Sequence, residues 1–153
     1  MSFHDMISSV DYQALAEFRH QIRRFLTFSE REARAAGLES QQHQLLLAIK
    51  GLPKGQRPTI GTLAERLQIR HHSAVELVNR LVDRQLAARR RSDVDGREVL
   101  IQVTARGEKL LRRLSLAHKD ELRSVGPSLV RALEAIITEP IVAGARAHVE
   151  SLQ

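Results

Sequence analysis

Apolar positions follow a helical period near both ends of the chain and change their pattern in the middle. Between residues 11 and 36, Leu15, Phe18 and Ile22 recur at helical spacing, and Gly37 is a suitable stop. At about 1.5 Å per residue, such a helix would reach roughly 40 Å. Because this length is unusual in a small domain, we expect the helix to pack against a partner.

The middle of the chain predicts two short helices joined by a tight turn. Residues 40–50 should form a separate helix, and the Gly and Pro content of residues 51–58 indicates a loop. Thr59 is suited to cap a short helix over residues 60–67. A longer helix over residues 71–86 follows after a brief connector. This is helix-turn-helix geometry, in which the second helix enters the major groove of DNA.

Alternation replaces the helical period in two runs, at residues 88–91 and 97–103. The pair Asp95-Gly96 lies between them, and Asp-Gly between two such runs is a hairpin signal. The hairpin carries several arginines and directly follows the helix-turn-helix pattern. We therefore interpret it as a wing that reaches the adjacent minor groove.

Two further helices are predicted after the hairpin. Thr104 should cap a helix over about residues 105–125, Gly126 and Pro127 should break it, and Pro127 suits the first turn of a last helix. The predicted fold class is mainly α (α+β), with about six helices and one hairpin. It is a winged helix-turn-helix with long N- and C-terminal helices.

Three stretches carry a resemblance to a known family. They are Leu63-Ala64-Glu65-Arg66-Leu67, then Leu77-Val78-Asn79-Arg80-Leu81, then Asp95-Gly96-Arg97 with Leu100, Val103-Thr104 and Gly107. In this order and spacing they resemble the MarR family of bacterial winged helix-turn-helix transcriptional regulators. The resemblance extends from about residue 15 to residue 133.

The resemblance implies a homodimer that binds near-palindromic operators in double-stranded DNA. Residues 1–36 and 105–153 would supply the dimerisation helices, and residues 37–104 the DNA-binding lobe of one continuous domain. We expect a repressor that a small-molecule effector releases, with activation left open. One alternative is a winged-helix module that binds protein without specific DNA binding, and another is a basic protein on an anionic membrane surface.

Composition narrows the possible functions. Among 153 residues, 24 are Lys or Arg and 18 are Asp or Glu, and the resulting net charge of +6 favours a polyanionic partner. The chain has no cysteine, which excludes disulfides, thiolate zinc sites and thiol redox sensing. It shows no catalytic or metal-ligand motif, so we expect no enzyme, cofactor or metal site. Without an apolar run of about 18 residues or a signal peptide, we expect a cytoplasmic protein.

Candidate DNA contacts lie on the second helix of the helix-turn-helix and on the wing. The recognition-helix candidates are Arg70, His71, His72, Ser73, Glu76, Asn79 and Arg80. Asn pairs with adenine, Arg with guanine, and Glu accepts from cytosine. On the wing, Arg90 and Arg91 can meet phosphates, and the resemblance places Arg97 at the minor groove. Asp95 would brace Arg97 by a charge-assisted hydrogen bond. The plainer interpretation is a solvated basic strand next to surface histidines.

A second group of residues is a candidate effector pocket for a small aromatic or anionic molecule. Phe18 would form a wall, and Arg19, His20 and Arg23 could pair with a ligand such as an aromatic carboxylate. His43 falls where the family frequently has an aromatic residue. The plainer interpretation of Phe18 is core or dimer packing.

Overall fold

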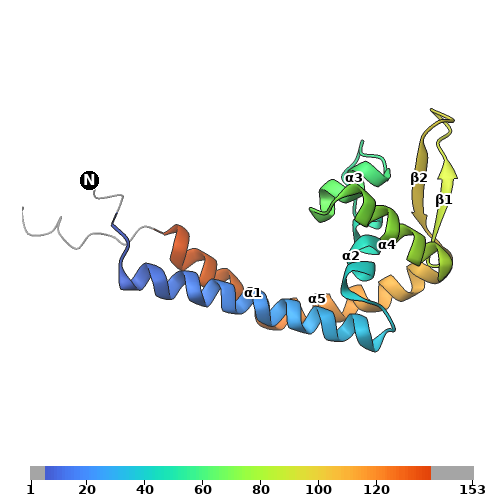
Figure 1. The fold of residues 1–153 in the computed structure, drawn as a ribbon. Helices are drawn as coiled ribbons and strands as arrows, with labels where there is room; N and C mark the ends of the chain where they lie inside the picture. Colours follow the sequence, from blue (N-terminus) through green and yellow to red (C-terminus); the bar gives the residue numbers. More distant parts are fainter. Residues whose placement is uncertain (1–5, 139–153) are drawn as a thin grey trace, which may run out of the picture. The chain divides into compact units, whose positions relative to one another are not determined.

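The computed structural model describes residues 6–138 and confirms the predicted winged helix-turn-helix class. Its elements are α1 (Ser9–Ala35), α2 (Ser40–Lys50), α3 (Ile60–Leu67), α4 (His71–Asp83), β1 (Ala87–Arg91), β2 (Val99–Val103) and α5 (Ala105–Ile137) (Figure 1). They form two compact units. The central unit comprises residues 26–122, and the terminal unit comprises residues 6–25 and 123–138. The helices α1 and α5 each contribute to both units.

The central unit is built around an apolar core to which each of its elements contributes. Side chains that are almost completely buried come from α2, α3, α4, β2 and α5: Leu45, Leu46, Leu63, Val78, Leu81, Ile101 and Leu114. Leu, Ile and Val side chains of this kind each contribute about 1.5–3 kcal/mol when they leave water. This core fixes the helix-turn-helix against the base of the hairpin.

Helix ends in the central unit fall where short polar residues and glycines predict them. The Thr59 hydroxyl accepts a hydrogen bond from the Thr62 backbone N–H at 3.1 Å, and α3 begins there. Thr104 caps α5 in the same way, accepting from the Gly107 N–H at 3.1 Å. Such caps satisfy N–H groups that have no partner inside the helix. Gly51 ends α2, as predicted.

Two of the predicted helix boundaries differ from the observed ones. The helix α1 begins at Ser9 rather than residue 11, because Ser8 and Asp11 exchange hydrogen bonds around its first turn. The helix α4 ends at Asp83 rather than residue 86. Gln85 adopts a positive φ of 59°, which turns the chain out of the helix and into β1.

The hairpin consists of two antiparallel strands whose register pairs Ala87 with Val103 and Arg91 with Val99. Leu100 and Ile101 are both buried, so the centre of β2 covers apolar surface on both of its faces. The Ile101 N–H also donates to the Pro58 carbonyl at 2.8 Å. The loop between α2 and α3 is therefore bonded to the wing.

The predicted break at Gly126 and Pro127 is wrong, because α5 continues through both residues to Ile137. Proline fixes φ near the helical value, and its cost comes from the missing N–H and a clash one turn earlier. The buried and half-buried positions of α5 keep one helical phase on either side: Leu111, Leu114, His118, Val125, Leu129, Ala132 and Ile136. Packing along this continuous stripe outweighs the local penalty of the proline.

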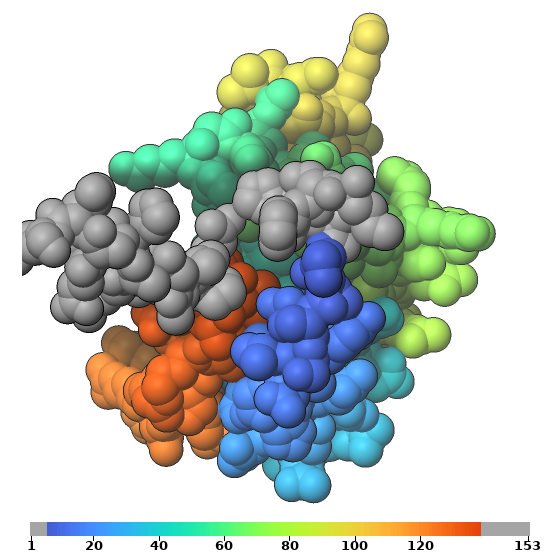
Figure 2. Space-filling model, turned by 90° about the vertical axis from the view of Figure 1, so that its left-hand side faces the viewer, coloured from blue at the N-terminus to red at the C-terminus, as the bar shows by residue number. Residues whose placement is uncertain are grey.

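The terminal unit consists of the first part of α1 and the last part of α5. Figure 2 shows these segments side by side, α1 in blue and α5 in red. Ala14 and Gln21 of α1 line a small cleft together with Ala132 and Ala135 of α5. The closely packed surface of this unit therefore consists largely of small side chains.

Two glycines of α5 should respond in opposite ways to an added methyl group. Gly126→Ala should raise the free energy of unfolding by about 0.5–1 kcal/mol, because glycine weakens a helix interior and the new Cβ would meet no atom within 4 Å. Gly107→Ala should lower it by about 1–3 kcal/mol, because its Cβ would lie 2.1 Å from the Leu86 carbonyl oxygen. Urea unfolding at one protein concentration measures both, and equal effects would contradict the packing described.

Candidate nucleic-acid interface

The helix α4 presents a polar face opposite its buried one. Ala74, Leu77, Val78 and Leu81 pack into the core. The sequence-predicted residues on the other face are exposed apart from half-buried Ser73: Arg70, His71, His72, Glu76, Asn79 and Arg80. Arg70 occupies the N-cap position without a side-chain cap bond. The first turn of α4 therefore combines outward cationic and imidazole side chains with the positive end of the helix dipole.

Two of these α4 residues make contacts within the protein. The Asn79 side-chain oxygen accepts a hydrogen bond from the Arg89 guanidinium of β1. Arg80 lies 3.5 Å from the Glu39 carboxylate, which precedes α2. Arg89 and Glu39 are absent from the sequence-based candidates, although Arg89 lies in the basic run that predicts the wing. Asn79 and Arg80 therefore help to hold α4 in place.

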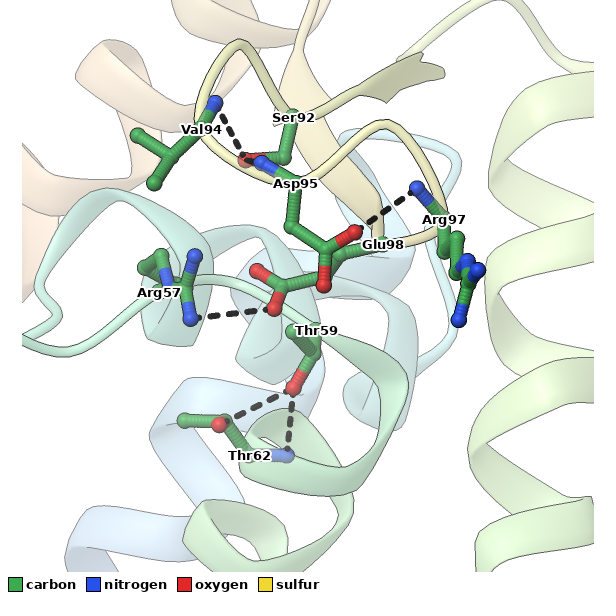
Figure 3. Close-up of polar contacts among 8 residues, drawn as sticks. All are labelled: Arg57, Thr59, Thr62, Ser92, Val94, Asp95, Arg97 and Glu98. Carbon is green, nitrogen blue, oxygen red and sulfur yellow. Dashed lines mark hydrogen bonds and ion pairs between the residues drawn. The ribbon is translucent and has the colours of Figure 1, made fainter.

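The tip of the wing is shaped by hydrogen bonds around one buried serine. The Ser92 hydroxyl accepts from the backbone N–H groups of Val94 at 3.2 Å and Asp95 at 3.3 Å (Figure 3). Across the hairpin, the Arg91 guanidinium donates to the Gly96 carbonyl at 2.9 Å. These bonds shape a turn whose outer residues stay exposed, among them Arg90, Asp95 and Arg97.

The expected bond between the Asp95 and Arg97 side chains is not present in the described structure. Asp95 instead accepts from the backbone N–H of Arg97 at 3.0 Å, while the Arg97 guanidinium extends away from it (Figure 3). The reason is geometric, since an Asp side chain commonly bonds the backbone two residues further along a turn. Asp95 thus shapes the turn, and the Arg97 guanidinium stays available.

Positive charge dominates the surface formed by α4 and the hairpin. Exposed arginines and histidines include Arg70, His71, His72, Arg89, Arg90, Arg91 and Arg97, and the exposed acids include Glu76, Asp93 and Asp95. Neutralising phosphates with such side chains releases counterions from a duplex and drives association. The arrangement is suited to a polyanion, with α4 offering base-reading groups and the hairpin offering cations beside it.

The five effector-pocket candidates are divided between the two units. Phe18 is half-buried and Arg19, His20 and Arg23 are exposed on the part of α1 that belongs to the terminal unit. His43 lies in the core of the central unit, where its side chain is 3% exposed. In this unit, a groove of about 690 Å³ lies between α2 and α5 and is lined by other residues: Leu47, Lys50, Gly51, Ala105, Glu108, Lys109, Leu111, Arg112 and Ser115.

His43 belongs to an aromatic cluster where α1, α2 and α5 meet. Its ring centroid lies 4.9 Å from that of His118, and the Phe28 ring meets His118 edge-on at 5.3 Å. His118 Nδ1 donates to the Leu114 carbonyl at 2.7 Å, so Nε2 of the neutral ring accepts from the Ser29 hydroxyl at 2.8 Å. Burial first, and the neighbouring His118 second, lower the pKa of His43.

The described residues limit two other kinds of site. None of their helices is both long and apolar enough to cross a membrane. Within residues 6–138, His, Asp and Glu side chains nowhere gather in a group of three that could hold a metal ion. The basic surface of the central unit is thus the candidate site with the strongest chemical character.

Comparisons with known proteins identify both family and fold. Residues 36–98 match the MarR family, and the curated proteins contain no match. AbsC, a MarR family transcriptional regulator from Streptomyces coelicolor, is 16% identical, with 84% of this chain and 90% of AbsC covered and a TM-score of 0.69.

Two structures of MepR from Staphylococcus aureus are also similar. A mutant bound to an oligodeoxyribonucleotide is 18% identical, with 76% of this chain and 82% of MepR covered and a TM-score of 0.60. MepR described as a transcription regulator of the multidrug efflux pump MepA is 17% identical, with coverages of 72% and 79% and a TM-score of 0.61. At these identities the likeness establishes a shared fold.

Protonation of His43 should destabilise the central unit. Because the folded state lowers the pKa of His43, its contribution to stability is present above the unfolded value of about 6.5 and is lost as the pH falls below that value. The variant His43→Leu should flatten the loss, which cannot exceed about 1.4 kcal/mol per pH unit for one proton. Urea unfolding at a series of pH values measures it.

Gln44→Leu is the matched control, since it makes the same kind of change at the next position of α2 and removes no titratable group. Its pH dependence should parallel that of the wild type. A wild-type slope retained in His43→Leu would show that another group causes the acid sensitivity.

Proposed function

We propose that this chain, a member of the MarR family, is a sequence-specific DNA-binding regulator of transcription that acts as a homodimer. The observation that carries the proposal is the basic surface on which exposed α4 residues lie beside an arginine-bearing hairpin. The oligodeoxyribonucleotide bound to MepR, which has the same fold, supports it. We expect a cytoplasmic repressor without catalytic activity.

In this proposal α4 reads bases and the wing holds the DNA backbone. His71, His72 and Ser73 at the start of α4 are the foremost base-reading candidates, because the first turn of a recognition helix reaches the base edges. Glu76 adds a group that accepts from cytosine. Asn79 and Arg80, which already have partners in the protein, act first by orienting α4. Arg90 and Arg97 supply cations for phosphates or the minor groove.

Exposed apolar side chains of the terminal unit support self-association. Large apolar residues stand exposed on both of its helical segments: Met6, Ile7, Val10, Tyr12, Leu15, Val130, Leu133 and Ile137. A contiguous apolar surface usually marks an interface. A second copy of this chain is the proposed partner, and its two-fold symmetry would place two α4 helices about 34 Å apart on a pseudo-palindromic operator.

The groove between α2 and α5 is the location that best supports an effector. Leu47 and Leu111 give it apolar walls, and Lys50, Lys109 and Arg112 give it cations. Such a lining suits a small aromatic carboxylate, the ligand class expected for the candidates Phe18, Arg19, His20, Arg23 and His43. A ligand of this kind would relieve repression by favouring a state with low DNA affinity. Release of bound DNA by aromatic carboxylates tests this, and unchanged binding would reject it.

Loss of one wing arginine should weaken DNA binding strongly. With a duplex of the promoter region beside the gene of this chain, Arg97→Ala should reduce affinity by about tenfold or more and lower the salt slope by about 0.9. Arg34→Ala is the control, because Arg34 is an exposed arginine of α1 outside the proposed interface. Fluorescence anisotropy over a salt series gives both quantities.

The same experiment distinguishes DNA binding from protein interaction. Binding to the promoter no tighter than to random DNA of equal length, and unchanged in Arg97→Ala, would favour a winged-helix module for protein partners. Tight, selective and salt-dependent binding supports the regulator.

A charge on the exposed face of the terminal unit should disrupt the proposed dimer. Val130→Glu places a carboxylate at a position that is 54% exposed in the single chain and would be desolvated in a dimer. Sedimentation analysis should show a dissociation constant raised by about tenfold or more. Val94→Glu makes the same change at the wing tip, where the side chain is 89% exposed, and should leave the dimer intact. Equal effects of both variants would argue against this interface.

A further inference from the structure

An ion pair connects the loop before α3 to the base of the wing. The Arg57 guanidinium lies 3.1 Å from the Glu98 carboxylate, with the Glu98 side chain 20% exposed (Figure 3). Next to this pair, the Ile101 N–H donates to the Pro58 carbonyl at 2.8 Å. The loop and the hairpin are therefore joined by one backbone bond and one charged side-chain bond.

Burial makes this pair costly to break. The second carboxylate oxygen of Glu98, Oε1, is buried and has no hydrogen-bond partner among the described residues. Removal of Arg57 would leave a mostly buried carboxylate without its counter-charge, which is far more unfavourable than the loss of a fully exposed pair. We expect the hairpin to shift or open when the pair is broken.

The place of Glu98 in the chain connects the pair to the DNA-facing surface. Successive side chains in extended backbone point to opposite sides, and Glu98 faces Arg57 while Arg97 points the other way (Figure 3). The backbone around Glu98 is also fixed, since its N–H donates to the Asp95 carbonyl and its carbonyl accepts from the Ser92 N–H, both at 2.9 Å. Anchoring Glu98 therefore orients Arg97.

We infer that the Arg57–Glu98 ion pair positions the wing, so that both residues act on DNA binding through Arg97. The inference rests on the proposed function as a DNA-binding regulator. It makes Glu98, an acidic residue beside a polyanion, a residue that strengthens binding. A direct role for Arg57 as a phosphate contact gives the opposite expectation, since removing Glu98 would then free Arg57 and remove a repelling charge.

The first measurement tests the wing without DNA. Backbone amide exchange of residues 92–98 should become about fivefold faster in Arg57→Ala and in Glu98→Ala, the upper range for a partly exposed pair. The double variant should match either single variant, because both remove one interaction. Glu98→Gln keeps the side-chain volume and replaces Glu98→Ala if that variant fails to fold. Unchanged exchange in the single variants, or additive effects in the double, would overturn the inference.

The second measurement uses the promoter duplex. Arg57→Ala and Glu98→Ala should each weaken binding by about threefold to tenfold. Arg34→Ala and Glu30→Ala remove the same two charges from another ion pair, at 2.6 Å on α1, and serve as controls. Tighter or unchanged binding by Glu98→Ala would overturn the positioning role. If the wild type binds no DNA, the proposed function fails, and amide exchange still decides whether the pair holds the wing.

Discussion

The structure depends on one close contact, at the joint where the hairpin leaves the helical core and returns to it. Gly107 in the first turn of α5 lies so close to the Leu86 carbonyl that even a methyl group would overlap it. The same carbonyl accepts the Thr104 N–H at 3.1 Å, and the Thr104 hydroxyl donates to the Gln85 carbonyl at 2.7 Å. The end of α4 and the start of α5 are thereby held together, which fixes the base of the wing beside α4.

Away from this joint, polar side chains control the direction of the wing. Arg89 connects β1 to Asn79 of α4, and Arg57 connects the loop before α3 to Glu98. The strands between these contacts are short, and most side chains of β1 are exposed. Since little apolar surface is buried along the hairpin, charged hydrogen bonds have a larger share in its orientation than in that of the helices. A surface built for a polyanion thus also uses its arginines as structural bonds.

The sequence could predict the elements whose signals are local. Thr59 and Thr104 are caps by residue type, and the Asp95-Gly96 pair marks the hairpin. Contacts between distant positions left no such signal: Arg57 and Glu98 pair only after the loop meets β2, and His118 meets Ser29 across 89 positions. The Asp95 and Arg97 prediction failed because it assigned a side-chain bond where the turn provides a backbone one. At Gly126 and Pro127, local helix breakers lost to an apolar stripe that keeps its phase over the whole of α5.

Continuity of α1 and α5 gives the His43 cluster its significance. Both helices contribute to the terminal unit and to the central unit, and within the central unit they meet α2 at Phe28, His43 and His118. A broken α5 would dissipate a displacement at its Pro127 end, whereas a continuous helix carries it along its axis. At the cluster such a displacement would meet a buried ring whose Nδ1 has no partner among the described residues. Unsatisfied polar groups make a core easier to rearrange than a purely apolar one. In the proposed regulator, the contact between α2 and the two long helices is therefore the part of the core best able to couple the dimer to the DNA-binding surface.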